Sequence, residues 1–289
     1  MASAREIRSK ITSIKNTQKI TRAMEMVAAS KMRKAQHRML ATRPYAEKIN
    51  TVIGHLAKSH PEFHHLYLEQ RPIKRAGFIV ISSDRGLCGS LNINLLKNVL
   101  HKNQTLEIEG SATEFCLLGH KAEAFFKRVG GNIQGVATHL GDTPNLNDLI
   151  GIVKLLFDHY ENEQIDVLFV AYNEFINTMV QKPRIQQLLP LVPTENGRLD
   201  YYWDYIYEPE AREVLTVLLQ RYLESQVYHA LIENLASEQA ARMVAMKNAS
   251  ENAGQIIDDL QLAYNKARQS TITKELADII AGSEALSEQ

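Results

Sequence analysis

Apolar residues form a narrow helical stripe in two long segments, one near each end of the chain. In the first segment the stripe begins at spacings of four and three and passes through Ile7, Ile11, Ile14, Ile20, Met24, Val27, Ala28, Met32, Ala35 and Met39. In the second it recurs at spacings of three and four through Met246, Ala249, Ala253, Ile256, Leu260, Ala263 and Ala267. A stripe this narrow suits one partner helix rather than a broad core. The pattern therefore predicts that residues 5–36 and 230–276 pair as an antiparallel coiled coil.

Both predicted helices are long. Ser3 and Glu6 have the capping-box spacing that starts a helix. The apolar pattern then continues to the neighbourhood of Pro61, a length of about 80 Å at 1.5 Å per residue. Pro44 lies within this pattern and is expected to kink the helix or to interrupt it briefly. In the second helix the stripe shifts past Ala267, which predicts a single-helix tip beyond the partner helix.

The segment between the two helices alternates between strand and helix patterns. Strand patterns occupy residues 76–81, 115–119, 133–138 and 165–172, and helix patterns occupy 92–101, 121–128 and 145–160. Elements of these lengths in alternation predict an α/β layer with a largely parallel sheet. Residues 175–180 and 184–189, divided by Lys182 and Pro183, are expected to form a hairpin at its edge. The expected domains are an N-terminal helix (1–60), an inserted α/β domain (61–208) and a C-terminal helix (209–289).

The loop from Ser82 to Asn92 leaves a predicted strand and enters a predicted helix, which is where phosphate-binding loops lie. It lacks the Gly-Lys-Ser/Thr of a Walker loop and the Gly-x-Gly-x-x-Gly of a dinucleotide turn. The simpler interpretation of its two glycines is a tight connection with φ > 0, and it is preferred to nucleotide binding. A third interpretation is a surface loop whose Asp84, Arg85 and Cys88 meet a partner.

Charge is balanced over the whole chain but not along it. The chain has 33 basic and 33 acidic residues. Residues 1–43 hold eleven Lys and Arg against two acids, a net charge of +9, and residues 209–289 hold seven against twelve, a net charge of −5. Opposite charges favour pairing of the two ends. The alternative is that the basic segment binds nucleic acid through phosphate contacts, although no recognised nucleic-acid motif accompanies it.

The two cysteines, Cys88 and Cys116, do not form a Cys-x-x-Cys pattern. This suits a reducing compartment rather than a disulfide framework. No apolar run approaches the roughly 20 residues that a membrane-spanning helix needs. The basic, Ser-containing N-terminus also fits a mitochondrial transit peptide, but the helix pattern continues well past a plausible cleavage site.

Candidate catalytic arrangements are missing from the sequence. It has no Ser-His-Asp or Cys-His arrangement with a supporting context, and no paired acids in a pocket-forming loop. His60, His64 and His65 cluster in one predicted loop, but no Cys or paired acid completes a metal-ligand set. Residues 201–209 contain the only Trp and four of the eleven Tyr, either as core aromatics or as an anchor for another protein. These features favour a structural or transmitting role.

Four stretches carry a resemblance to a known family. They are Asn16-Thr17-Gln18-Lys19-Ile20-Thr21 with Ala23-Met24-Glu25-Met26-Val27-Ala28-Ala29-Ser30-Lys31-Met32, then Ser83-Asp84-Arg85-Gly86-Leu87-Cys88-Gly89, then Glu233-Asn234-Leu235-Ala236-Ser237-Glu238-Gln239-Ala240-Ala241-Arg242-Met243, and Tyr264-Asn265-Lys266-Ala267-Arg268-Gln269-Ser270-Thr271-Ile272-Thr273-Lys274-Glu275-Leu276. In this order they resemble the gamma subunit of the rotary ATP synthase, in its bacterial form. Ser90 stands where many relatives have a second Gly. The cysteine-bearing regulatory insertion of the chloroplast form is missing, so redox switching is not expected.

The resemblance implies a non-catalytic subunit without a cofactor, present as one copy in the proton-translocating ATP synthase. The paired helices would be the central shaft inside a hexamer of alpha and beta subunits. The α/β domain would be the foot, against the epsilon subunit and the ring of c subunits. The subunit would couple proton flow to ATP synthesis or hydrolysis and would regulate the ATPase. Its expected place is peripheral, on the cytoplasmic face of the bacterial inner membrane, with no nucleic acid as partner.

The resemblance also implies roles for single residues. Met24 would lie on the shaft opposite the mobile region of the beta subunit, with Arg242 near it on the C-terminal helix. Arg85 and Cys88 would face the moving beta domain. Upper contacts with alpha and beta would come from Arg268, Gln269, Thr273 and Glu275. Foot contacts would come from Tyr205, Tyr207 and Glu208.

Overall fold

The computed structural model describes residues 4–59, 66–144, 146–191 and 211–287. The three predicted foot residues, Tyr205, Tyr207 and Glu208, lie outside the described residues, as do the histidines at positions 60, 64 and 65. The chain divides into two compact units, one formed by residues 1–27 with 243–289 and the other by residues 28–242.

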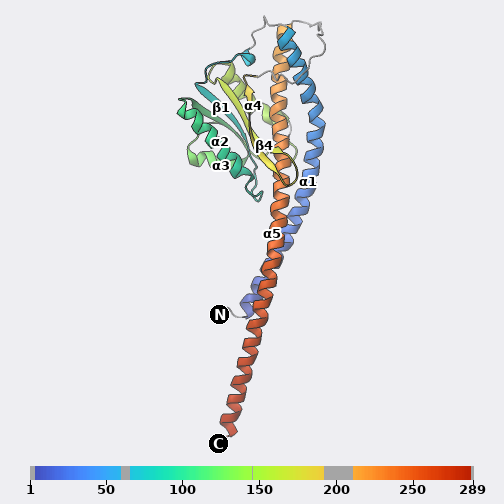
Figure 1. The fold of residues 1–289 in the computed structure, drawn as a ribbon, viewed down its shortest axis with the longest axis vertical. Helices are drawn as coiled ribbons and strands as arrows, with labels where there is room; N and C mark the ends of the chain where they lie inside the picture. The colour runs from blue at the N-terminus through green and yellow to red at the C-terminus, as the bar shows by residue number, and fades with distance from the viewer. Residues whose placement is uncertain (1–3, 60–65, 145, 192–210, 288–289) are drawn as a thin grey trace. The chain divides into compact units, whose positions relative to one another are not determined.

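Two long helices, α1 and α5, take part in both units (Figure 1). Helix α1 comprises Ala4–Ser59 and helix α5 comprises Ala211–Ser287, with 56 and 77 residues. Helix α1 continues through Pro44, so the interruption considered from the sequence is wrong. A proline removes one backbone hydrogen bond, and the bonds on either side keep the helix continuous.

In the first unit, α1 and α5 run antiparallel. Gln18 Nε2 donates to the carbonyl oxygen of Ser250 (3.1 Å), whereas the earlier residues Ile7 and Ile11 pack with the later residue Ile257. The partly buried neighbours of this small cluster are Ile14, Leu260, Tyr264 and Ala267. The predicted antiparallel pairing of the two ends is therefore confirmed.

Four residues of the predicted stripe lie outside the packed seam. Ile256 is 47% exposed, while its neighbour Ile257 is 6% exposed. Ile20 and Val27 are 60% and 54% exposed, and Ala263 is exposed as well. The expectation for these four was wrong because a straight helix of 3.6 residues per turn drifts away from a stripe written at 3.5.

The second unit contains a five-stranded sheet in the order β3-β2-β1-β4-β5. The strands are β1 (Arg75–Ile81), β2 (Ala112–Leu118), β3 (Ile133–Ala137), β4 (Val167–Phe175) and β5 (Gln181–Leu189). The first four are parallel to their neighbours, and β5 is antiparallel to β4. The predicted α/β layer with a largely parallel sheet is confirmed.

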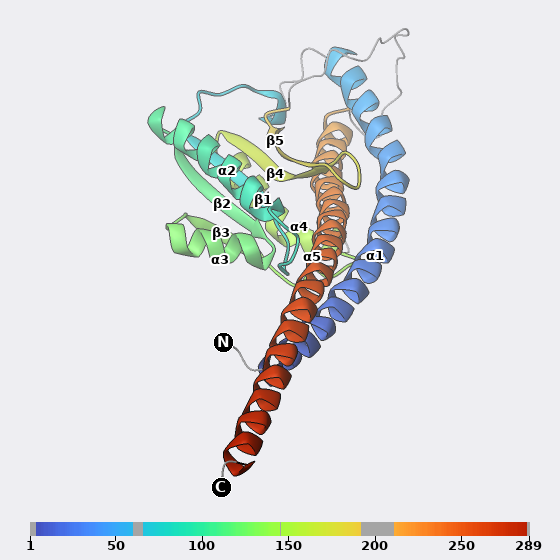
Figure 2. The same ribbon diagram turned by 60° about the horizontal axis from the view of Figure 1, so that its bottom comes forward.

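Helices cover both faces of this sheet (Figures 1 and 2). They are η1 (Leu66–Leu68), α2 (Leu91–Ile108), α3 (His120–Val129), α4 (Leu146–Glu161) and the part of α5 in this unit. Helices α2 and α3 cover one face, where Phe78, Phe115 and Phe126 pack together. Helix α4 and residues 219–231 of α5 cover the other face. This face gives α5 a broad apolar contact rather than a narrow seam.

The edge hairpin differs in detail from the expectation. Its first arm is the end of β4, which continues to Phe175, and residues 176–180 form the turn. Lys182 and Pro183 do not divide the hairpin. They lie within β5, where Pro183 is paired with Asn173. A proline is tolerated there because an edge strand leaves one row of backbone groups without ladder partners.

Among the glycines that the structure describes, Gly119, between β2 and α3, has the least space for an added side chain. Its φ is +98°, and an added Cβ would lie 2.4 Å from the carbonyl oxygen of Ser82. We expect Gly119→Ala to lower the free energy of unfolding by more than about 2 kcal/mol, since strain and a steric clash add together. Urea unfolding of the isolated chain measures this loss.

Gly130→Ala is the matched control. Its φ of +90° is similar, but no atom lies within 4 Å of the added Cβ, so the expected loss is about 1 kcal/mol from the backbone alone. Equal losses in the two variants would contradict the proposed clash at Ser82.

Candidate functional site

The carboxyl ends of β1 and β4 meet at the middle of the sheet. The chain passes from β1 to β2 on one side, while β4 pairs with β1 on the other side. In open α/β sheets the crevice at such a reversal of strand order is the usual place for a ligand. In this protein the crevice is occupied by side chains of α5.

Polar side chains of α5 bind the end of β4 at this crevice. The Oδ1 atom of Asn234 accepts hydrogen bonds from the backbone N–H (3.1 Å) and the side-chain Nδ2 (2.9 Å) of Asn173. The hydroxyl of Ser237 donates to the carbonyl oxygen of Asn173 (2.9 Å). All three residues are at most 1% exposed. The hydrogen-bonding groups at the end of β4 are thus satisfied by the helix itself.

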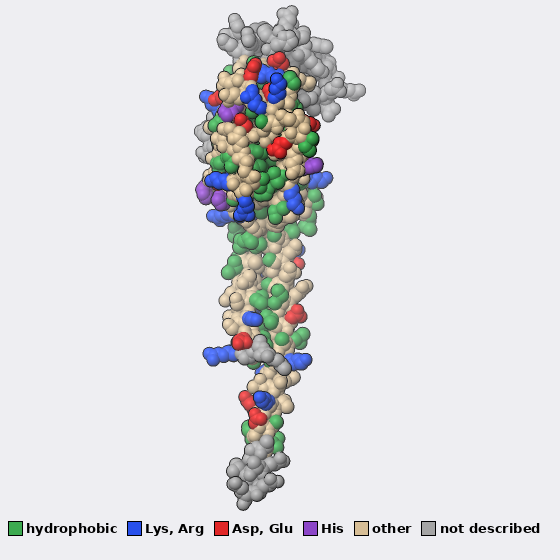
Figure 3. Space-filling view, turned by 90° about the vertical axis from the view of Figure 1, so that its left-hand side faces the viewer, with side chains coloured by type: hydrophobic (Ala, Val, Ile, Leu, Met, Phe, Trp, Pro, Cys, Tyr) green, Lys and Arg blue, Asp and Glu red, His purple; other side chains and the backbone are tan. Residues whose placement is uncertain are grey.

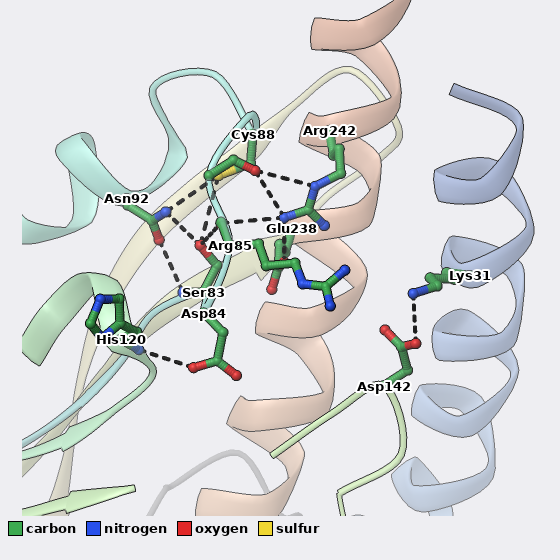
Figure 4. Close-up of polar contacts among 11 residues, drawn as sticks. Lys31, Ser83, Asp84, Arg85, Cys88, Asn92, His120, Asp142, Glu238 and Arg242 are labelled. Carbon is green, nitrogen blue, oxygen red and sulfur yellow. Dashed lines mark hydrogen bonds and ion pairs between the residues drawn. The ribbon is translucent and has the colours of Figure 1, made fainter. Parts of the chain in front are cut away.

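Arg242 of α5 binds the loop that follows β1 (Figure 4). Its Nη2 atom donates to Glu238 Oε1 (2.6 Å) and to the carbonyl oxygens of Arg85 (3.3 Å) and Gly86 (3.2 Å). Arg242 and Glu238 are 9% and 6% exposed. Burial raises the pKa of the Glu238 carboxyl, and the adjacent guanidinium opposes that rise. The ion pair holds the Arg242 guanidinium in place on α5, and the guanidinium's hydrogen bonds to the two carbonyls fix α5 to this loop.

The loop itself is held by internal hydrogen bonds. Asn92 donates from Nδ2 to Ser83 Oγ (2.7 Å) and to Cys88 Sγ (3.3 Å), and it accepts from the backbone N–H of Ser83 (3.2 Å). Ser83 in turn donates to the carbonyl oxygen of Arg85 (2.7 Å). The loop is therefore ordered by hydrogen bonds with Ser83 and Asn92, in addition to those that it accepts from Arg242.

Two backbone donors near this loop that a phosphate could use already have partners. Asp84 Oδ1 accepts from the backbone N–H of His120 at the start of α3 (3.0 Å), so a carboxylate occupies the positive end of that helix. The backbone N–H of Ser83 donates to Asn92 Oδ1 (3.2 Å). This arrangement argues against the nucleotide interpretation of the loop.

Two side chains at the loop tip are exposed, and the cysteine is not. Arg85 is exposed, and Leu87 is 61% exposed with a left-handed φ of 64°. Cys88 is 3% exposed, and burial raises the pKa of its thiol. Sequence reasoning chose Arg85 and Cys88 and missed Leu87. Alternating burial within a loop leaves no periodic signal that would have revealed it.

The structure brings Arg85, Cys88 and Arg242 together in the second unit. Met24 is half-buried on α1 in the first unit, so its expected closeness to Arg242 stays a prediction. The other predicted contacts on α5 are all exposed: Arg268, Gln269, Thr273 and Glu275.

The sequence analysis gave Arg242 a role from the family resemblance but missed that Asn234, Glu238 and Arg242 share one face of the helix. Glu238 and Arg242 are four residues apart, the spacing of an ion pair on one helix face. Asn234 lies a further four residues back, so the polar face of this segment was visible in the sequence. The sequence did not show that this face is buried.

Glu233 is a second buried acid at the same junction. Its Oε1 atom accepts from the backbone N–H of Phe175 (3.3 Å), and its Oε2 atom lies 3.6 Å from Nδ1 of His229. Burial raises the pKa of this carboxyl to about 7, with Glu174 adding to the rise and Arg184 opposing it.

Metal sites and membrane-spanning helices are two further possibilities. Within the described ranges, no group of three or more His, Cys, Asp and Glu side chains is placed to hold a metal ion. In the same part of the chain, no helix has the length and apolar character to cross a membrane.

Comparisons with known proteins identify the family. The profile of a family described as ATP synthase matches residues 3–286. The ATP synthase gamma chain of Nitrosococcus oceani is 60% identical over 289 residues, which are 99% of this chain and 100% of that protein. The chain belongs to the ATP synthase gamma chain family. It is accordingly the central-stalk subunit of a rotary complex and not a catalytic subunit.

Other relatives and solved structures agree with this assignment. The gamma chain of Legionella pneumophila (strain Corby) is 56% identical over 288 residues, with 99% of this chain and all of that protein covered. The central stalk of the Tetrahymena thermophila mitochondrial ATP synthase has a TM-score of 0.61 at 27% identity, covering 80% of this chain and 99% of that one. A Euglena gracilis mitochondrial ATP synthase chain, at 20% identity, has the same fold with a TM-score of 0.65, covering 98% and 94%.

In this gamma chain, Arg242 is expected to be essential for the stability of the junction. Arg242→Met would leave the Glu238 carboxylate buried without its partner, so we expect a loss of about 3–5 kcal/mol in the free energy of unfolding. Replacing both charges, in Arg242→Met with Glu238→Met, should restore most of that loss. Urea unfolding of the isolated variants measures both values, and a double variant as unstable as the single one would contradict the pairing.

Glu233 is expected to make stability depend on pH. Because its pKa rises from 4.5 to about 7 on folding, the folded chain holds a proton that the unfolded chain has lost between these values. Stability should therefore fall as pH rises through this range and stay lower above it. Glu233→Gln keeps the acceptor for Phe175 N–H and removes the charge. The Tm of this variant should therefore exceed that of the wild type at about pH 8 and match it at about pH 4. Glu251→Gln, an exposed acid on the same helix, is the control, and a pH-independent difference for Glu233→Gln would contradict the argument.

Proposed function

We propose that the chain is the rotor shaft that couples proton flow through the membrane sector to ATP synthesis or hydrolysis by the alpha and beta subunits, and that it takes part in regulating the ATPase. The observation that carries this proposal is α5. One uninterrupted helix of 77 residues is fixed to the α/β domain by buried polar groups, pairs with α1, and is exposed over residues 268–280. A continuous helix with these three environments is suited to transmit torque.

The exposure of residues 268–280 of α5 supports the proposal that other subunits cover this part of the helix in the complex. Every residue from 268 to 280 is exposed, including Ile272 (44%), Leu276 (54%) and Ile279 (67%). Apolar side chains are visible on this part of α5 in Figure 3. An exposed apolar stripe of this kind marks a protein interaction surface. The alpha and beta subunits would surround it, with Arg268, Gln269, Thr273 and Glu275 at the contact.

The helix pair would act on the catalytic sites by differential contact. A shaft that binds one conformation of a beta subunit better than another shifts that subunit toward it, and the size of the shift is limited by the difference in affinity. Because α1 and α5 have different sequences, the surface of the pair changes around its axis, so three beta subunits would meet three different surfaces. Met24, half-buried on α1, would lie at one of these contacts, with Arg242 on the C-terminal helix near it.

The loop after β1 would supply a second contact with the moving beta domain. Arg85 and Leu87 are exposed at its tip and would make this contact directly. Cys88 and Arg242 are buried and would act by holding the loop in place. This division of roles refines the expectation that Cys88 itself faces the partner.

The remaining partners are proposed from the relatives. The Tetrahymena structure is described as a central stalk with the c-ring, and the Euglena structure as OSCP, F1 and c-ring. By analogy, the α/β domain would be the foot against the c-ring and the epsilon subunit, with Tyr205, Tyr207 and Glu208 at the contact. We further propose a coiled-coil shaft, one copy per complex, and a peripheral place on the cytoplasmic face of the bacterial inner membrane.

Reconstitution with alpha and beta subunits tests the proposed function. The full chain should join the hexamer as one copy and should confer ATP-driven proton pumping when the membrane sector is added. The isolated chain should not hydrolyse ATP. Assembly without any effect on proton pumping would contradict the coupling role.

A truncation after Ser270 tests the role of the exposed end. The seam of the first unit extends only to Ala267, so the truncated chain should fold with unchanged thermal unfolding. We expect the yield of the complex with alpha and beta to fall, since apolar contact surface is removed. The melting curve of the isolated variant is the control, and an unchanged yield of complex would argue against the assigned contact.

A further inference from the structure

The loop between β3 and α4, residues 138–144, lies between both long helices in the second unit. On the α1 side, Lys31 Nζ forms an ion pair with Asp142 Oδ2 (2.6 Å), and Arg38 Nη1 donates to the carbonyl oxygen of Asp142 (3.0 Å). On the α5 side, the hydroxyl of Tyr228 donates to the carbonyl oxygen of Pro144 (3.5 Å). Figure 4 shows Asp142 reaching from the loop to Lys31 on α1.

The spacing of the two basic residues places both of them on the side of α1 that faces Asp142. Lys31 and Arg38 are seven residues apart, so they lie on one face of α1, two turns from each other. One loop residue accepts both, through its carboxylate and its backbone carbonyl. His139 and Gly141 have left-handed φ values of 61° and 71°, which bend the loop on its approach to Asp142.

Helix α1 has little apolar contact along this stretch. Ala28 (1% exposed) and Met32 (7% exposed) are buried. From residue 33 to residue 40, the last α1 side chains that the structure describes, none is buried. The Lys31 contact therefore lies beside the last buried residues of this stretch, and the Arg38 contact lies beyond them, where no described side chain of α1 is buried.

We propose that residues 138–144 form a strap that locks α1 to the α/β domain and to α5, so that all three turn as one body under load. This inference rests on the proposed shaft function. Lys31, Arg38 and Asp142 are then positioning residues for torque transmission. In this proposal they have no direct part in nucleotide binding or proton transfer.

The strap contributes stiffness more than folding stability. The side chains of Lys31 and Asp142 are 36% and 53% exposed, and exposed ion pairs contribute little to the free energy of unfolding. A defect should therefore appear when the rotor works against a load and should be small in an unfolding experiment.

Charge reversal in the reconstituted complex tests the strap. Asp142→Lys places a cation against Lys31, and we expect ATP synthesis in vesicles to fall by about two- to fivefold. The fall should be largest near the lowest proton-motive force that still supports synthesis. The exchange Lys31→Asp with Asp142→Lys restores the attraction and should restore synthesis. Glu109→Lys, an exposed acid at the end of α2, makes the same charge change away from α1 and is the control.

The outcomes separate this inference from the function on which it rests. All complexes are compared at equal assembled amounts. A wild-type complex that supports no synthesis would refute the shaft function itself. If the wild type works and Asp142→Lys equals it at every proton-motive force, the strap is refuted. A loss in Asp142→Lys that the exchanged pair does not reverse also refutes it, since the loss then has another cause.

Discussion

The buried ion pair between Arg242 and Glu238 is the constraint on which the rest of this structure depends. Two charges cannot remain at 9% and 6% exposure unless each has a partner. The guanidinium finds further acceptors in the carbonyls of Arg85 and Gly86. A helix and a loop more than 150 residues apart in sequence are thereby fixed to each other. Together with the Asn173–Asn234 contacts, the pair closes the crevice where an α/β sheet usually binds its ligand.

Closing the crevice turns a ligand-binding architecture into a mechanical junction. The sheet keeps parallel strands and helices on both faces, but its strand ends bind a segment of the same chain. The Asn173 backbone at the end of β4 and the Ser83 N–H at the end of β1 are here satisfied by side chains of the same protein. This explains how a subunit without catalytic residues retains an α/β domain. The domain provides a broad, rigid surface to which a helix can be fixed.

Helix α5 passes through three environments, and burial decreases along it. Residues 219–231 contribute to a sheet core, Ile257 belongs to a narrow seam, and residues 268–280 are exposed. Helices in proteins are stabilised mainly by packing of an apolar face, so the three parts depend on different partners. The first depends on the sheet, the second on α1, and the third on the proposed surrounding subunits.

The sequence alone determined the order of the main strands and helices, the antiparallel pairing of the two ends and the family, because these depend on local periodicity and on motifs several residues long. It misplaced the division of the edge hairpin and the interruption at Pro44. It did not determine which residue of a stripe faces its partner. Ile257 rather than Ile256 is buried because the helix period drifts against the written repeat. It also did not show that Cys88 points inward while Leu87 points outward, or that Asp142 meets α1. Only the tertiary structure decides these points, since each depends on contacts between segments far apart in the chain.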